Sequence, residues 1–257
     1  MEFQSIGELA KLPLTESFSG TCPTHGESTV EIFKAQKVKE WFCTDCHHEQ
    51  VLKEDDARIR RERTEAIYRA ACLPEKYMGQ KFTTTTPAQR DVRAQAKAFL
   101  DCLKKERHWT TLLMVGETGT GKTLLATELA EVMMSKQLLT VRYCTSSQMI
   151  AEIQESYSSE GKKIGKTQAG EILRFVSYDI LILDEIDAKP SYENANVLLT
   201  EVINQRYNAL RPVIAITNQP LDILHRFVGD RVNSRLHENA FICAFTWPDF
   251  RRQQVKP

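Results

Sequence analysis

The sequence predicts an α/β domain built on a five-stranded parallel sheet, preceded by a small metal-binding module. From residue 109 onward, short apolar runs alternate with longer amphipathic segments, which is typical of parallel strands joined by crossover helices. The first 50 residues differ from the rest, because they hold three of the seven cysteines and three of the six histidines. We therefore expect two parts with different architectures.

Five apolar runs are the predicted strands of the sheet. The runs cover residues 112–115, 140–144, 179–183, 213–217 and 241–245. The chain between each pair is long enough for at least one helix, as parallel pairing requires.

The segment between the module and the sheet is predicted to be largely helical. Charged residues crowd residues 53–71, with alanine and isoleucine at helical spacing, which predicts an exposed linker helix that ends before Leu73-Pro74. A threonine run and Pro87 predict a loop before a second helix over 89–105. The predicted parts are a module at 1–50, a linker helix at 51–80 and the main domain at 81–257.

Composition excludes several classes of protein. The 34 basic and 34 acidic residues cancel, so bulk charge does not bind this protein to DNA. No apolar run approaches the roughly 18 residues of a membrane helix, and residues 1–10 do not resemble a secretion signal. The other four cysteines are scattered among apolar or helical segments, unlike a disulfide scaffold. We expect a cytoplasmic protein without membrane partners.

A phosphate-binding loop follows the first predicted strand. The pattern G-x-x-x-x-G-K-[ST] is matched by Gly116, Glu117, Thr118, Gly119, Thr120, Gly121, Lys122 and Thr123. A helix over 122–135 follows, so backbone N–H groups and the helix dipole can surround the β-phosphate. Lys122 is expected to reach the β- and γ-oxygens, and the Thr123 hydroxyl to bind Mg²⁺. The alternative is a glycine turn that arose by chance. Such a turn would rarely carry the whole pattern between a strand and a helix.

Two carboxylates end the third predicted strand. Asp184 is suited to hold the metal, and Glu185 to polarise a water aimed at the γ-phosphate. The pair could instead be an acidic helix start, but the upstream phosphate loop favours the catalytic interpretation. The loop and the pair together predict an ATPase.

The fourth predicted strand ends in Thr217 and Asn218, at the edge where ligands bind open parallel sheets. The Asn218 amide is a candidate for holding the attacking water or a γ-phosphate oxygen. The alternative is that Asn218 caps the helix that follows before Pro220.

Arg231 and Arg235 are four residues apart, hence on one helix face. In a ring or spiral ATPase such an arginine stabilises the γ-phosphate bound by an adjacent subunit, and Arg235 is the favoured candidate. The alternative is that both are solvated surface charges. Arg251 and Arg252 follow the last strand and are candidates for contacting the nucleotide in cis.

The N-terminal cysteines have the spacing of a zinc site. Cys22 and His25 form one pair and Cys43 and Cys46 another, as in a tetrahedral Cys₃His site. His47 or His48 remains an alternative ligand, and unligated thiols remain the alternative to a metal site. Four protein ligands leave no open coordination position on the metal for a substrate. The module is therefore expected to bind a partner rather than to catalyse a reaction.

The chain resembles the DnaC-type replicative-helicase loaders, a branch of the AAA+ ATPases close to the IstB-type transposition helpers. The resemblance covers roughly residues 55–252 and rests on the phosphate loop, the acidic pair, Thr217-Asn218, the segment 229–235, and Phe245-Thr246-Trp247 leading into Arg251. It implies an AAA+ core without a C-terminal helical lid. Loaders of this type usually begin with a helical segment, so the cysteine and histidine module is a departure.

The resemblance also implies roles for particular residues. Asn218 takes the first-sensor role, Arg235 the arginine-finger role and Arg251 the second-sensor role, while Tyr192 is a candidate for stacking on single-stranded DNA. The implied function is a weakly hydrolysing ATPase that uses ATP, Mg²⁺ and Zn²⁺ and helps place a hexameric DnaB-type helicase on single-stranded DNA. An IstB-type transposition helper and a nucleotide-sensing adaptor with negligible hydrolysis are the alternatives.

Overall fold

The computed structural model describes residues 15–33, 42–105, 108–137, 139–156, 165–188 and 194–250. The chain divides into two units, Met1–Arg63 and Thr64–Pro257. Three candidate site residues, Tyr192, Arg251 and Arg252, lie outside the described residues. Among the helices that the structure describes, none is long and apolar enough to cross a membrane.

The first unit contains a β-hairpin that the sequence did not predict. Strand β1 (Thr15–Cys22) pairs antiparallel with β2 (Gly26–Phe33), and the turn uses Gly26 at φ 77°. Side chains alternate between faces, so Val30 is buried while the hydroxyls of Ser19 and Thr29 meet on the exposed face at 3.1 Å. The strands are mostly polar, which is why no apolar run marked them.

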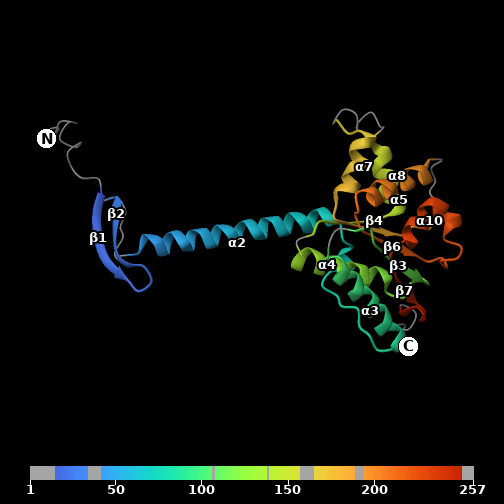
Figure 1. The fold of residues 1–257 in the computed structure, drawn as a ribbon, viewed down its shortest axis with the longest axis horizontal. Coiled ribbons are helices and arrows are strands. Elements are labelled where there is room, and N and C mark those ends of the chain that lie inside the picture. The colour runs from blue at the N-terminus through green and yellow to red at the C-terminus, as the bar shows by residue number, and fades with distance from the viewer. Residues whose placement is uncertain are drawn as a thin grey trace. The chain divides into compact units, whose positions relative to one another are not determined.

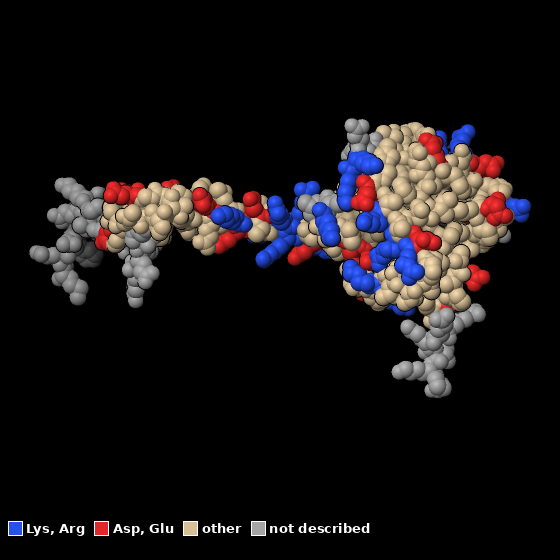
Figure 2. All heavy atoms as spheres, turned by 60° about the horizontal axis from the view of Figure 1, so that its bottom comes forward, with Lys and Arg blue, Asp and Glu red and all other residues tan. Residues whose placement is uncertain are grey.

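Helix α2 (Thr44–Ala71) begins well before the predicted start at Lys53 and ends where predicted. Asp45 lies in its first turn, where a negative charge favours helix formation. Acidic and basic side chains are interspersed along it (Figure 2), and one pair joins Asp55 to Arg58 at 2.8 Å. Most of its side chains are exposed, as predicted, but near its end Ile67 and Ala71 belong to the core of the second unit.

Helix α3 (Pro87–Cys102) has a start that its sequence explains. The side chain of Thr86 accepts a hydrogen bond from the backbone N–H of Gln89, while the Gln89 side chain accepts from the backbone of Thr86. This reciprocal cap, with Pro87 at the first helical position, starts the helix two residues before the predicted range. The short 3₁₀ helix η1 (Glu75–Tyr77) lies in the segment that joins α2 to α3.

The predicted five-stranded parallel sheet is confirmed, in the order β4-β5-β6-β3-β7. The strands are β3 (Thr111–Gly116), β4 (Val141–Thr145), β5 (Ile180–Asp184), β6 (Val213–Thr217) and β7 (Ala240–Phe245). Because all strands run in one direction, the ends of β3, β5 and β6 bring the phosphate loop, the acidic pair and Asn218 to one edge.

Helices cover both faces of the sheet (Figure 1). They are α4 (Lys122–Gln137), α5 (Ser146–Glu155), α7 (Gln168–Ser177), α8 (Ala195–Asn208), α9 (His225–Val228) and α10 (Asp230–His237). One core packs α3, α4 and the end of α2 against residues such as Met114 and Ile182, and the other packs α5 and α7 to α10 against Leu113 and Leu183. Alternate residues of each central strand therefore serve the two cores.

Arg206 on α8 is fully buried and contacts the end of the sheet that lies opposite to the phosphate loop, where β5 and β6 begin. The guanidinium of Arg206 donates to the backbone oxygens of Phe175 at 2.7 Å, Tyr178 at 2.9 Å and Pro212 at 2.7 Å, and to two further carbonyls nearby. The carbonyls at the end of α7 carry the negative end of the helix dipole, which favours a cation. Burial lowers the pKa of Arg206 to about 9, because it penalises the charged form.

Candidate functional site

The phosphate loop spans the end of β3 and the start of α4, and glycine is required at its close approaches. Gly119 and Gly121 have φ of 80° and 99°. A Cβ at Gly119 would lie 1.8 Å from a carboxylate oxygen of Asp249, and one at Gly116 would lie 2.3 Å from the Phe245 carbonyl. The Lys122 ammonium donates to the carbonyls of Gly116 and Glu117 at 2.6 and 2.7 Å, so it already lies over the loop.

Residues that follow β7 hold the phosphate loop in place through two hydrogen bonds. The Trp247 indole donates to the Thr120 carbonyl at 2.9 Å, and the Phe250 backbone N–H donates to the Gly119 carbonyl at 3.2 Å. The sequence did not predict these contacts, because they join residues that lie more than 100 positions apart. They fix the outer rim of the loop from a distant part of the chain.

The acidic pair faces the loop across the edge of the sheet. Asp184 is buried, and its Oδ2 accepts hydrogen bonds from Thr123 Oγ1 at 2.8 Å and Tyr143 Oη at 2.7 Å. Its Oδ1 accepts from the Glu185 backbone N–H at 2.9 Å. Burial, reinforced by the charges of Asp184 and Glu185, raises the pKa of Tyr143, so this phenol stays protonated and donates.

Glu185 adopts a left-handed backbone conformation, with φ 50°, which is uncommon outside glycine. Two contacts hold this turn: the Ser146 hydroxyl donates to the Glu185 carbonyl at 2.8 Å, and the Ile186 N–H donates to the Ile216 carbonyl at 3.0 Å. Strained residues of this kind cluster at functional sites, where the surrounding structure stabilises them.

The phosphate loop and the acidic pair line one cavity of roughly 480 Å³, and this size suits a small ligand. Asn218, the candidate for the first-sensor role, also lines it. Helix α9 starts at His225 with Leu224 at its N-cap, so Asn218 does not cap that helix. The cavity is completed by residues that the sequence did not single out: Lys76, Tyr77, Gln80, Phe82, Thr83, Leu124 and Phe250.

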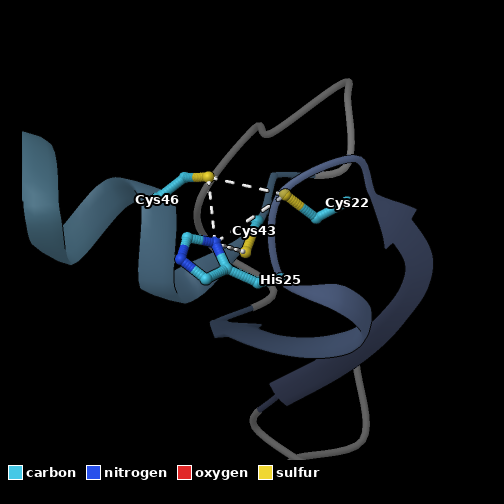
Figure 3. A group of neighbouring side chains, drawn as sticks. All are labelled: Cys22, His25, Cys43 and Cys46. Atoms are coloured by element: carbon cyan, nitrogen blue, oxygen red, sulfur yellow. Dashed lines mark hydrogen bonds between the residues drawn. The ribbon is translucent and has the colours of Figure 1, made fainter.

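The four predicted zinc ligands lie together in the first unit (Figure 3). Cys22 ends β1, His25 lies in the hairpin turn, Cys43 directly precedes α2, and Cys46 lies in its first turn. Their ligand atoms are all within 4.8 Å of one another. His47 and His48 are exposed and do not belong to this group. The donor set fits a tetrahedral Zn²⁺ site.

The electrostatics of this cluster favour a cation. Backbone N–H groups of His25 and Thr24 lower the pKa of Cys22 to about 6, and the hydrogen bonds of His25 to Cys22 and Cys43 raise the pKa of His25 to about 9. The hydrogen bond between Cys46 and Cys22, whose sulfurs are 3.5 Å apart, raises the pKa of Cys46 to about 12, and burial and the repulsion between negative charges on the sulfurs act in the same direction. A divalent cation at the centre would remove that repulsion.

Glu49 supports the cluster and was not predicted. Its Oε1 lies 3.3 Å from His25 Nε2, while Nδ1 of the same ring faces the three sulfurs. A carboxylate on the second ring nitrogen orients a metal-binding histidine and increases its basicity. The spacing from Cys46 to Glu49, one helical turn, was the signal in the sequence.

With this geometry in place, comparisons with known proteins identify the family. A family model described as "IstB-like ATP binding protein" matches residues 29–236. The chain belongs to this IstB-like family. It is an AAA+ ATP-binding protein with distant homology to the DnaC helicase loaders, and it carries a Cys/His cluster near its N-terminus.

Individual relatives of this IstB-like protein are distant. The uncharacterized protein YdaV of Escherichia coli (strain K12) is 26% identical over 188 residues, which cover 72% of each chain. The replicative helicase loader DnaC of the same organism is 22% identical over 171 residues, which cover 62% of this chain and 66% of DnaC. A crystal structure of the DnaC helicase loader superposes with a TM-score of 0.58 at 19% identity, covering 66% of this chain and 99% of that one. This structural likeness shows the fold.

The two candidate arginines of this IstB-like protein differ in their surroundings. Arg231 is exposed on α10, whereas Arg235 is half-buried with its guanidinium carbon 4.9 Å from the Tyr207 ring centroid. The Arg235 carbonyl accepts from the Trp109 indole at 2.8 Å. Neither arginine lines the cavity of its own chain. The structure therefore brings the phosphate loop, the acidic pair and Asn218 together, but not Arg235.

Proposed function

We propose that this protein is an ATP-dependent loader that binds a hexameric DnaB-type replicative helicase and helps place it on single-stranded DNA. The observation that carries the proposal is the combination of the phosphate loop, the acidic pair and Asn218 around one cavity of a DnaC-like sheet with a separate Cys/His module. Distant homology to the loader DnaC supports the choice of partner.

The proposed chemistry is hydrolysis of ATP with slow turnover. The loop N–H groups and Lys122 would bind the β- and γ-phosphates, and Thr123 with Asp184 would hold Mg²⁺, which screens the charge of the phosphates. Glu185 would accept a proton from the attacking water, and Asn218 would orient that water or a γ-oxygen. Tyr77 and Phe82, which line the same cavity, offer aromatic surface for the base.

We infer that the site is completed by a second copy of the chain. Arg235, or Arg231 beside it, would reach the γ-phosphate bound by a neighbour and stabilise the charge of the transition state. The absence of both from the cavity lining of their own chain supports action between subunits. Hydrolysis would then reset or release the assembly.

The Cys/His module is proposed to hold the helicase, with Zn²⁺ bound by Cys22, His25, Cys43 and Cys46. Charge supports a protein partner, because residues 1–50 carry eight carboxylates against four lysines and no arginine, which is a net negative charge. Binding to nucleic-acid phosphates depends on basic side chains. DNA contact is assigned to the second unit, Thr64–Pro257, which is called the ATPase unit after its proposed activity and in which Tyr192 stays a prediction.

A pull-down with the full chain tests the proposal. We expect a DnaB-type hexamer to be retained when ATP is present and released after hydrolysis, and we expect the Cys43→Ser variant to lose most of this retention, because it removes one proposed zinc ligand of the module. The Lys122→Ala variant separates the two functions, because it should lose ATP binding while its module stays intact. A helicase that associates in no nucleotide state would refute the loader assignment.

An IstB-type transposition helper is the second candidate, and the family model favours it specifically. Its mark would be ATP-dependent binding to duplex DNA with filament growth in the absence of any helicase. Electron microscopy of the protein with duplex DNA and ATP distinguishes the two functions.

A nucleotide-sensing adaptor that does not hydrolyse ATP is the third candidate. Because Glu185 is the proposed base, Glu185→Gln should lower turnover roughly 10²- to 10⁴-fold while leaving ATP binding intact. Equal residual rates for wild type and variant would remove Glu185 from catalysis and favour the adaptor.

A further inference from the structure

The acidic pair is held from one side by a neighbouring element whose residues have no assigned role. Strand β4 pairs with β5 so that Thr145 lies opposite Asp184. Two residues of this element, Tyr143 near the end of β4 and Ser146 at the start of α5, each donate one hydrogen bond to the pair.

The Tyr143 bond is one of three hydrogen bonds that fix the orientation of the Asp184 carboxylate. A carboxylate offers about four lone-pair sites. Three are used within the protein: Thr123 and Tyr143 share Oδ2, and the Glu185 N–H occupies one site on Oδ1. One acceptor site then remains for a water on the metal, and its direction is set by the other three bonds.

The Ser146 bond acts on the other member of the pair through the backbone. Its hydroxyl is buried and donates to the carbonyl of Glu185, the residue with φ 50°. The junction that carries Ser146 is itself rigid. The Thr145 side chain accepts from the Gln148 N–H at 3.1 Å, and the Gln148 side chain accepts from the Thr145 N–H at 2.9 Å.

We propose that Tyr143 and Ser146 are positioning residues for nucleotide hydrolysis, which rests on the proposed ATPase function. Tyr143 orients the Asp184 carboxylate toward the metal, and Ser146 holds the turn that presents the Glu185 carboxylate to the attacking water. Neither residue contacts the reacting atoms. Through these two hydrogen bonds, the junction between β4 and α5 positions both Asp184 and Glu185.

Single substitutions in the full chain separate the two roles. Tyr143→Phe removes one hydrogen bond to a charged group, so the Mg²⁺ concentration for half-maximal hydrolysis should rise roughly 10-fold or more. Ser146→Ala should lower kcat roughly 10-fold with the Mg²⁺ requirement and the KM for ATP unchanged. Thermal melting of each variant reports whether the fold is retained.

Matched controls come from α7 and its end. Tyr178→Phe removes a half-buried phenol, and Ser177→Ala removes a hydroxyl that donates to the backbone oxygen of Arg174 at 2.7 Å. Both lie outside the cavity lining and should leave the Mg²⁺ requirement and kcat at wild-type values.

The outcomes are distinct from those that test the proposed function. A wild-type Mg²⁺ requirement in Tyr143→Phe, or a wild-type kcat in Ser146→Ala, overturns the corresponding role. So does a change in the KM for ATP alone, which indicates a general structural effect. If the wild type hydrolyses no ATP, the ATPase function and the Ser146 role both fail, and calorimetry of Mg²⁺-dependent ATP binding still tests Tyr143. Loss of helicase binding with these kinetics intact refutes only the partner.

Discussion

The two units of this chain are stabilised in different ways. The ATPase unit buries two apolar cores on the faces of a five-stranded sheet, and its site residues sit at the ends of strands that these cores fix. The described part of the first unit has a two-stranded hairpin, with few buried apolar side chains, and four converging metal-binding side chains. A hairpin alone is marginally stable in water. Packing of the two cores maintains the first kind of site, whereas the second consists of four side chains that a metal ion would hold together.

Removing the metal should have the largest effect and should be confined to the first unit. Structural zinc sites contribute an apparent 10–16 kcal/mol, and small modules unfold without them. We expect one zinc per chain, and chelation should abolish amide-exchange protection in the hairpin while ATP binding at the phosphate loop is retained. Hydrogen exchange with mass spectrometry measures both units in one sample. Protection that survives complete removal of zinc would contradict the comparison.

The corresponding disruption of the ATPase unit is Arg206→Met. It leaves several buried carbonyls without donors, each costing roughly 1–3 kcal/mol, so the free energy of unfolding of this unit should fall by more than about 3 kcal/mol. Denaturant unfolding followed by tryptophan fluorescence measures the loss. Zinc content should stay at the wild-type value. Arg211→Met removes the half-buried ion-pair partner of Asp179 and should cost much less, because the Asp179 carboxylate keeps two hydrogen bonds from Thr140.

Glu49→Gln tests the metal dependence more finely. Removing a carboxylate that orients a metal-bound histidine typically weakens metal affinity 10- to 100-fold. We expect a loss of this size in competition titrations with a chromophoric chelator, with the hairpin still folded at saturating zinc. The matched control is Glu54→Gln, which removes a carboxylate of α2 bonded to Gln50 rather than to the cluster. Equal affinities for the two variants would exclude the role of Glu49.

The smallest expected effect is that of Thr86→Ala at the N-cap of α3. The cap satisfies one backbone N–H, and its loss should lower the free energy of unfolding of the ATPase unit by about 1 kcal/mol. A shift in the denaturation midpoint without a change in slope measures it. Thr86→Ser keeps the hydroxyl and should retain most of the stability.

The sequence by itself determined the parts of this protein whose signals are local. The phosphate loop, the acidic pair and the Cys/His quartet depend on short spacings, and the five strands on apolar runs, so all could be predicted before the structure was known. The parallel pairing of the five strands and the family assignment agree with that prediction, whereas the order of the strands in the sheet came from the structure.

Only the tertiary structure decided which distant side chains support these motifs. Tyr143 and Ser146 reach the acidic pair across 41 and 39 positions of sequence, and Trp247 reaches the phosphate loop across 127. Arg235 packs on Tyr207 instead of standing free. Such contacts carry no local pattern, because packing between elements, not spacing along the chain, selects the partners. The sequence therefore predicts which groups do the chemistry, and the fold determines how firmly each is held.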